Sequence, residues 1–170
     1  MALVRVVNTV DEKSGARLPR WRELPDLELY MDQVLALTER YLGACPGLDS
    51  RGLTAAMVNN YVKLGVLPAP VRKRYGRTQL ARLLILCVLK PVLPIASIKK
   101  LLESGLRGST EEACYDAFCE RFEETQRARE IRGGDGQDMR TAILCAALRA
   151  QAEQALAQRL VDELEEKIQN

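Results

Sequence analysis

The sequence predicts a mainly helical protein, and three observations support this. Apolar residues recur at spacings of three and four along most of the 170-residue chain. Aromatic residues make up only 5% of the chain, whereas alanine and leucine are plentiful. Glycine and proline gather in short stretches between the periodic segments. We therefore expect a helical domain over residues 18–107, preceded by a flexible arm (1–17) and followed by a C-terminal helical region (108–170).

The first predicted helix covers residues 26–42. Pro25 suits a helix start, and Asp26 and Glu28 would lie in the first turn, where the helix dipole favours acids. Gly43 fits a C-terminal stop. An extended lead-in would pack on this helix through Leu18, Trp21 and Leu24.

A second helix is predicted over residues 54–65, after a loop (43–53) that contains three glycines and a proline. Thr54 is a suitable N-cap, and Gly65 a suitable end. The packed stripe would run through Leu53, Met57, Tyr61 and Leu64. The opposite face would be small, amide-bearing and basic, with Ala55, Ala56, Asn59, Asn60 and Lys63.

The segment after this helix predicts a short basic hairpin or wing over residues 71–77. Pro68 and Pro70 exclude helix and favour extended backbone. Three consecutive cations follow, and Tyr75-Gly76 marks a turn before Arg77. The consecutive cations are Arg72, Lys73 and Arg74.

Four further helices are expected. Thr78 would cap a buried helix that is broken by Pro91, and Pro94 would start a helix that ends at Gly105. Ser109 or Thr110 would cap a helix that runs to about residue 129. The GGDG at 133–136 would be a linker, and the last helix would cover 138–168.

The last helix carries an unusual apolar stripe, repeated every fourth residue. Such a stripe drifts about 40° per step around a helix, so one straight partner cannot cover all of it. We expect its first half to pack on the rest of the chain. Near its end, a four-three-four spacing suits a second helix and predicts a homodimer. The residues with that spacing are Ala157, Val161, Leu164 and Ile168.

Charge is strongly uneven along the chain. Between Arg51 and Arg107 there are eleven basic residues and one acid, Glu103, a net charge of +10 in a protein of net charge +2. The flanking segments are acidic, with −2 over residues 1–50 and −6 over 108–170. Concentrated positive charge is typical of a surface that meets a polyanion, although a solvated basic surface gives the same count.

Other kinds of site have little support. The chain has no histidine and no CxxC pair, and its five cysteines come without a secretion signal, so we expect semi-buried thiols rather than disulfides or metal ligands. No paired-carboxylate or nucleophile motif stands out. We expect no catalytic activity, no metal and no cofactor. Because no apolar run could span a bilayer, we also expect a cytoplasmic location.

The order of these elements is that of a winged helix-turn-helix. The segment TAAMVNNYVKLGVLPAPVRKRYGRTQLARLLILCVLKPVLPIASIKKLL resembles the DNA-binding domain of MerR-type regulators. Residues 18–102 resemble even more closely the bacterial domain-of-unknown-function family 1836, in LPRW, PDLELYMDQV, MVNNYVK, KRYGRTQLA and PIASIKKLL. The resemblance implies a transcriptional regulator. Two features depart from the MerR pattern: the eleven-residue loop 43–53, and Ala56 and Asn59 where arginines often stand.

Individual residues receive distinct expected roles. Asn59 and Asn60 could read an adenine edge in the major groove, or one could bracket a loop. Thr54 could bind a phosphate through its backbone amide. Tyr75 could stack on the nucleic acid or pack within the turn. Contacts to phosphates are expected from Lys63, Arg72, Lys73, Arg74 and Arg77.

The function that we predict is sequence-specific DNA binding by a transcriptional regulator. The recognition helix 54–65 would enter the major groove, and the wing 71–77 would lie on the backbone of double-stranded DNA. The alternative is a non-enzymatic protein-interaction adaptor that uses the same fold to meet an acidic protein. A small-molecule effector is compatible with either function, but no sequence feature identifies one.

Overall fold

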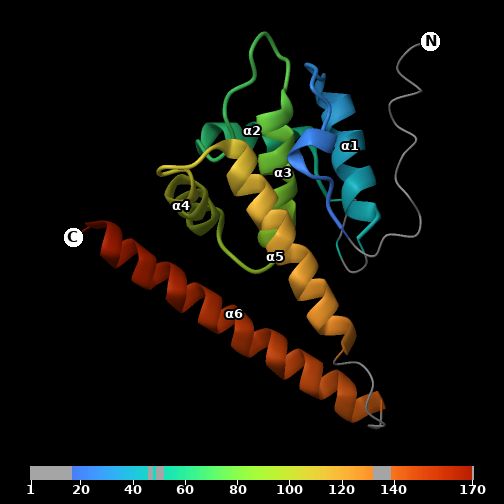
Figure 1. Cartoon of the computed structure of the whole chain (residues 1–170), viewed down its shortest axis with the longest axis vertical. Coiled ribbons are helices and arrows are strands. Elements are labelled where there is room, and N and C mark those ends of the chain that lie inside the picture. Colours follow the sequence, from blue (N-terminus) through green and yellow to red (C-terminus); the bar gives the residue numbers. More distant parts are fainter. Residues whose placement is uncertain (1–16, 46–47, 49–51, 132–138, 170) are drawn as a thin grey trace.

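The computed structural model describes residues 17–45, 48, 52–131 and 139–169, and side chains are described except at 128–131, 139–140, 142 and 168–169. The predicted arm and the GGDG linker lie outside these residues, apart from Arg17. Over the described residues the chain is helical, as predicted, and has no strand, so the expected wing is present only as isolated β-bridges (Figure 1). The described residues form a short 3-10 helix, η1 (Trp21–Glu23), and six α-helices: α1 (Met31–Gly43), α2 (Ala55–Lys63), α3 (Arg77–Leu89), α4 (Ile95–Gly105), α5 (Glu111–Ile131) and α6 (Met139–Gln169).

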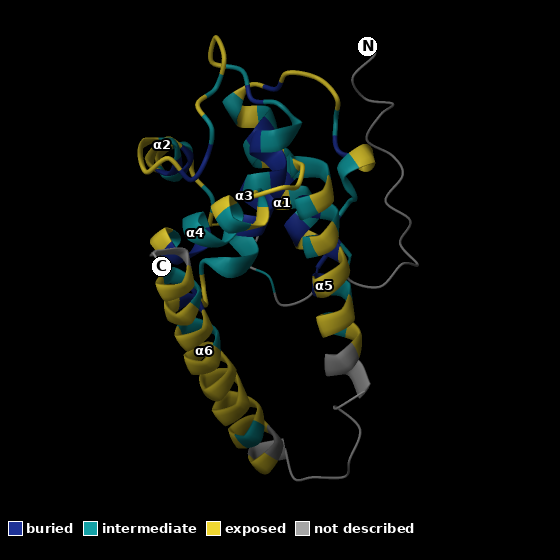
Figure 2. Ribbon diagram, turned by 60° about the vertical axis from the view of Figure 1, so that its left-hand side comes forward, coloured by how far each residue is buried: buried dark blue, intermediate teal, exposed yellow. Residues whose placement is uncertain are grey.

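Helix α3 forms the centre of the molecule. It contacts α1, α4 and α5, so it is surrounded on most sides (Figure 2). Seven of its residues are buried, and four of them are consecutive: Leu83, Leu84, Ile85 and Leu86. The dense run of aliphatic residues in the sequence therefore has its expected place, because only a helix enclosed on most sides can bury apolar residues all round its axis.

Helix α1 begins five residues later than predicted. Leu29 pairs with Tyr75 in an antiparallel bridge: each backbone nitrogen donates to the carbonyl oxygen of the other residue, at 2.8 and 2.9 Å. This bridge requires extended backbone at residue 29, and the helix starts only at Met31. Asp26 and Glu28 thus lie outside the helix, and the interpretation of Pro25 as the helix start was wrong.

Local capping explains most of the other helix boundaries. Thr54 Oγ1 accepts a hydrogen bond from the nitrogen of Met57, and Thr110 Oγ1 accepts one from the nitrogen of Ala113. The cap at Thr54 was predicted, and Thr110 was one of the two caps considered for α5. The expected cap at Thr78 was wrong, because α3 begins at Arg77 and the Gln79 side chain accepts from the Gly76 nitrogen instead.

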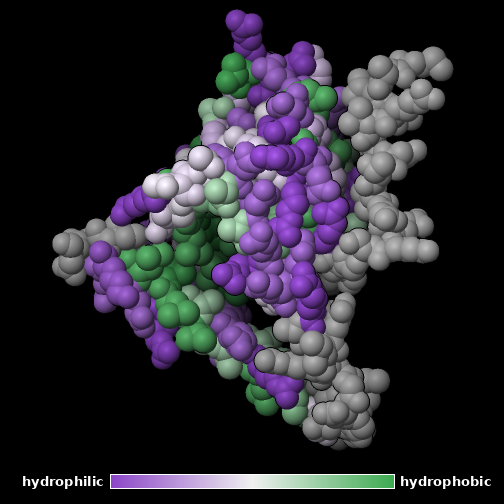
Figure 3. All heavy atoms as spheres, viewed as in Figure 1, coloured by the Kyte–Doolittle hydropathy of each residue, from purple (hydrophilic) through white to green (hydrophobic). Residues whose placement is uncertain are grey.

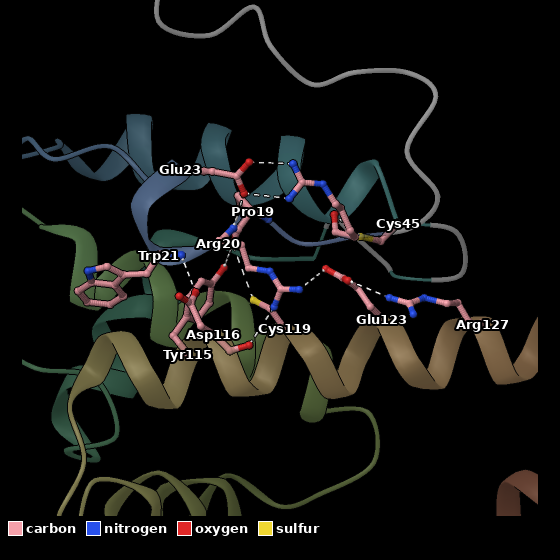
Figure 4. A network of polar contacts seen from close by, with 11 residues as sticks. Pro19, Arg20, Trp21, Glu23, Cys45, Tyr115, Asp116, Cys119, Glu123 and Arg127 are labelled. Carbon is pink, nitrogen blue, oxygen red and sulfur yellow. Dashed lines mark hydrogen bonds and ion pairs between the residues drawn. The ribbon is translucent and has the colours of Figure 1, made fainter.

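The lead-in segment binds to α5 through a network of polar contacts (Figure 4). Asp116 Oδ1 accepts from the Trp21 nitrogen at 2.7 Å, and the Asp116 carbonyl accepts from Arg20 at 2.9 Å. The hydroxyl of buried Tyr115 donates to the Pro19 carbonyl at 2.9 Å. These contacts join residues almost a hundred positions apart, so the first part of α5 belongs to the same packed body as α1 to α4.

Helix α6 contacts the rest of the molecule through its second half. Val161 is buried and Ala157 half-buried, Gln154 donates to the Val92 carbonyl, and Lys100 of α4 pairs with Glu165. Most of the first half is exposed (Figure 2). The expectation that the first half packs on the chain was therefore wrong. The second helix that faces Ala157 and Val161 is α4 of the same chain, because α6 contacts α4.

None of the described helices is long and apolar enough to cross a membrane.

Candidate nucleic-acid interface

Helix α2 presents one exposed polar face. Ala56, Asn59, Asn60 and Lys63 are all exposed and follow the spacing i, i+3, i+4 and i+7, which places them on one side of the helix. Val58 and Tyr61 are buried on the opposite side. Leu64, which was expected on the packed stripe, is instead exposed just beyond the helix. The amides of Asn59 and Asn60 and the amine of Lys63 therefore lie on one surface. Side chains of other described residues do not cover this surface.

The basic segment after α2 makes a two-residue hairpin. Val71 and Arg74 exchange two backbone hydrogen bonds, of 2.9 and 3.1 Å, across Arg72 and Lys73. We call residues 71–74 the hairpin. Arg72 and Lys73 have φ angles of 51° and 62°, so both lie in the left-handed region, as in a type I′ turn. This region is unfavourable for residues with a side chain, at about 1–2 kcal/mol each. Both cations are exposed.

The next three predicted contact residues turn towards the protein. Arg74 stacks on the ring of Tyr30, with its guanidinium carbon 3.8 Å from the ring centroid. Tyr75 is only 3% exposed, so it packs in the core, which was one of its two expected roles. Arg77 lies 3.5 Å from Asp26 and 5.8 Å from the Trp21 ring, and its side chain is 21% exposed. The predicted wing therefore offers fewer free cations than its sequence indicates.

Three further cations of the basic segment have partners within the chain. Arg82 pairs with Glu111 at the start of α5 and donates to the Val66 carbonyl. Lys99 donates to the Leu64 carbonyl at 3.2 Å, where it stabilises the C-terminal end of α2. Lys100 pairs with Glu165 of α6. Part of the segment's positive charge thus offsets the acidic flanks of the same molecule.

The remaining described cations of the segment have no ion pair with any described residue. They are Lys63, Arg72, Lys73, Lys90 and Arg107. Lys63 ends α2, while Arg72 and Lys73 form the tip of the hairpin that leads from α2 to α3. Thr54 lies at the opposite end of α2, where its side chain caps the helix. The candidate interface consists of Lys63, Arg72, Lys73 and Thr54, together with the amides of α2.

The thiols of the chain are poorly suited to chemistry. Cys45 and Cys119 are buried, and the five cysteines are free, as predicted. Burial raises the pKa of Cys45, Cys87 and Cys119 to about 11, because the interior disfavours the thiolate. Among the described residues, no three histidine, cysteine, aspartate or glutamate side chains gather as metal ligands.

An apolar groove of about 420 Å³ lies between α3, α4 and α5. Figure 3 shows hydrophobic residues gathered in the hollow between α6 and the rest of the molecule. Ile85, Ile98, Leu102 and Phe118 are among the groove's lining residues, and no charged side chain of the described part of the chain lines it. The groove can hold an apolar group, but it offers little polarity with which to recognise a particular one.

Comparison with known families identifies the sequence class. Residues 19–119 match the family described as a domain of unknown function, DUF1836. The chain belongs to this family. The resemblance predicted for residues 18–102 is thus confirmed, and the match continues through Cys119 into α5, in agreement with the packing of Tyr115 and Asp116 on the lead-in. No curated protein and no solved structure matches the chain.

Proposed function

We propose that this DUF1836 protein is a sequence-specific DNA-binding transcriptional regulator. Helix α2 would enter the major groove, and the hairpin would lie on the adjacent phosphate backbone. The succession of α1, α2, hairpin and α3 would then act as a MerR-like winged helix-turn-helix. The observation that carries the proposal is the set of exposed groups on α2 and the hairpin that have no ion pair with any described residue.

The hairpin supports the proposal most strongly. Its two central residues are large cations held in the left-handed region, where asparagine and glycine are favoured. Residues kept in unfavourable conformations cluster at functional sites, because stability alone does not retain them. Here two exposed positive charges stand at the tip of a two-residue turn, and this suits a contact to phosphate oxygens.

Helix α2 supplies the chemistry for reading bases. A carboxamide can accept from and donate to an adenine edge at once, which makes Asn59 and Asn60 candidate base-reading residues. Both side chains are exposed. Neither makes a hydrogen bond with another described residue, so both amides are available to a base. Lys63, one turn further along the same face, would contact phosphate.

An acidic protein is the rival partner. Leu64 and Val71 are exposed large apolar residues beside α2 and in the hairpin, and an interface with a protein would bury such side chains. An acidic protein would contact the same cations as DNA would. The two functions therefore differ in whether duplex DNA binds at this site.

Selection from a random duplex library tests the proposal. The full-length protein should enrich a defined sequence, and Asn59→Ala or Asn60→Ala should lower the preference for that sequence by about 1–3 kcal/mol. Gln151→Ala, an exposed amide of α6, is the matched control and should leave the preference unchanged. A library that stays random after repeated selection would contradict sequence-specific binding.

A further inference from the structure

The outer side of α6 carries a continuous apolar ridge. Leu144, Leu148, Leu156 and Leu160 are between 41% and 68% exposed, and Ala152 in their middle is exposed too. The five side chains are spaced four residues apart, and the ridge they form is about 24 Å long. Soluble monomers rarely leave a continuous apolar strip of this kind in water.

The anchoring of α6 fixes where the ridge points. Buried Val161 marks the side that faces α4. At 100° per residue, Ala152 lies about 180° from Val161 around the helix, and Leu148 and Leu156 lie about 140° from it. Leu144 and Leu160, at the two ends of the ridge, lie about 100° from it. The middle of the ridge therefore faces away from α4, and no described residue of this chain covers Ala152, Leu148 or Leu156.

We infer that the ridge binds the same ridge of a second copy of the chain, in an antiparallel homodimer. Ridges of residues spaced by four interdigitate when two helices cross at about −50°, the commonest packing class in globular proteins. Ala152 lies at the middle of the ridge, where a small side chain allows the two helix axes to approach closely. A two-fold axis at this point pairs identical surfaces.

The charges of α6 select the antiparallel arrangement. Residues 139–152 contain two arginines and no acid, whereas residues 153–169 contain five acids and two basic residues. Antiparallel helices place the basic half of each copy beside the acidic half of the other, and parallel helices would place like charges together. In this arrangement position 148 of one copy faces position 156 of the other.

The dimer differs from the one predicted from the sequence. The four-three-four face near the C-terminus, which includes Ala157 and Val161, is turned towards α4 of the same chain. The middle of the ridge, at Ala152, lies on the opposite side of the helix. The dimer does not depend on the proposed DNA-binding function, and its test requires no nucleic acid.

The first test is the mass of the full-length protein by sedimentation and light scattering. At about 10 µM the wild type should have twice the 19.0 kDa mass of the chain. Leu148→Lys and Leu156→Glu should each raise the dimer dissociation constant by about 100-fold. Ile143→Glu is the matched control: Ile143 is 61% exposed, lies about five full turns from Val161 and so at the same angle around α6, and should leave the dimer intact.

The second test fixes the orientation. The double variant Leu148→Lys/Leu156→Glu places lysine opposite glutamate in an antiparallel dimer, and it should recover most of the affinity that either single change removes. Both positions are exposed in the monomer, so circular dichroism should show unchanged folding. Four results would each overturn the antiparallel dimer. They are a wild type that is monomeric at about 100 µM, single variants of unchanged mass, an equal loss of dimer affinity with Ile143→Glu, and no recovery of dimer affinity in the double variant.

Discussion

Two groups of cations in the same basic segment have different surroundings. Arg77, Arg82 and Lys100 each pair with an acid from another part of the chain, whereas Lys63, Arg72 and Lys73 lie exposed on α2 and the hairpin. The first group holds elements together, and the second remains available to a partner. The comparison teaches that a count of charges along the sequence overstates the binding surface, because packing decides which charges remain available.

The largest effect is expected for Arg82→Ala. The side chain of Arg82 is 14% exposed. Its removal leaves the part-buried carboxylate of Glu111 without its ion-pair partner, and it leaves the Val66 carbonyl without a hydrogen-bond donor. The free energy of unfolding should fall by about 2–4 kcal/mol, measured by urea denaturation. The double variant Arg82→Met/Glu111→Leu should lose less, because it removes both charges. A loss below about 0.5 kcal/mol for the single variant would refute a structural role for this pair.

The hairpin should respond in the opposite direction. Arg72→Asn/Lys73→Gly introduces the residues that a type I′ turn prefers, so the free energy of unfolding should rise by about 1–2 kcal/mol. The same change should weaken DNA binding and lower the slope of log affinity against log salt by about two.

The matched control for the hairpin is the exchange Arg72→Lys/Lys73→Arg, which keeps both charges and both side chains in the turn. It should leave the salt slope unchanged. A less stable Asn-Gly variant would show that the left-handed conformation of the two residues is not unfavourable here.

The smallest effect on stability is expected for Lys63→Ala. Lys63 is exposed and has no ion pair with a described residue, so unfolding should change by less than about 0.5 kcal/mol. The salt slope should nevertheless fall by about one. Lys90→Ala serves as the control, since Lys90 lies at the far end of α3 from the hairpin, and there the slope should stay constant.

The elements that sequence predicts well are those set by local signals. Thr54 caps α2, Gly65 follows it with a φ of 69°, and Pro94 precedes α4. Each signal acts within one turn of the backbone, so it can be read without knowledge of the fold. The family resemblance likewise depends on contiguous motifs, and it was confirmed over residues 19–119.

The features that sequence missed depend on contacts between distant parts of the chain. Arg82 and Glu111 are 29 residues apart, and the start of α1 depends on the bridge between Leu29 and Tyr75. The four-residue spacing of the apolar stripe in α6 was read correctly from the sequence, but a spacing does not show which side of the helix faces the core. For the same reason the sequence could not show that Arg77 faces the lead-in or that Tyr75 is buried.

The most direct measurement is the salt dependence of binding to random duplex DNA between about 50 and 200 mM salt. Replacing Lys63, Arg72 and Lys73 together by serine should lower the slope by about three, whereas replacing Arg77 by Gln and Lys100 by Ser should change it by less than about one half. If both sets lowered the slope equally, or if neither did, the exposed cations would not be the DNA-binding surface, and the account would be contradicted.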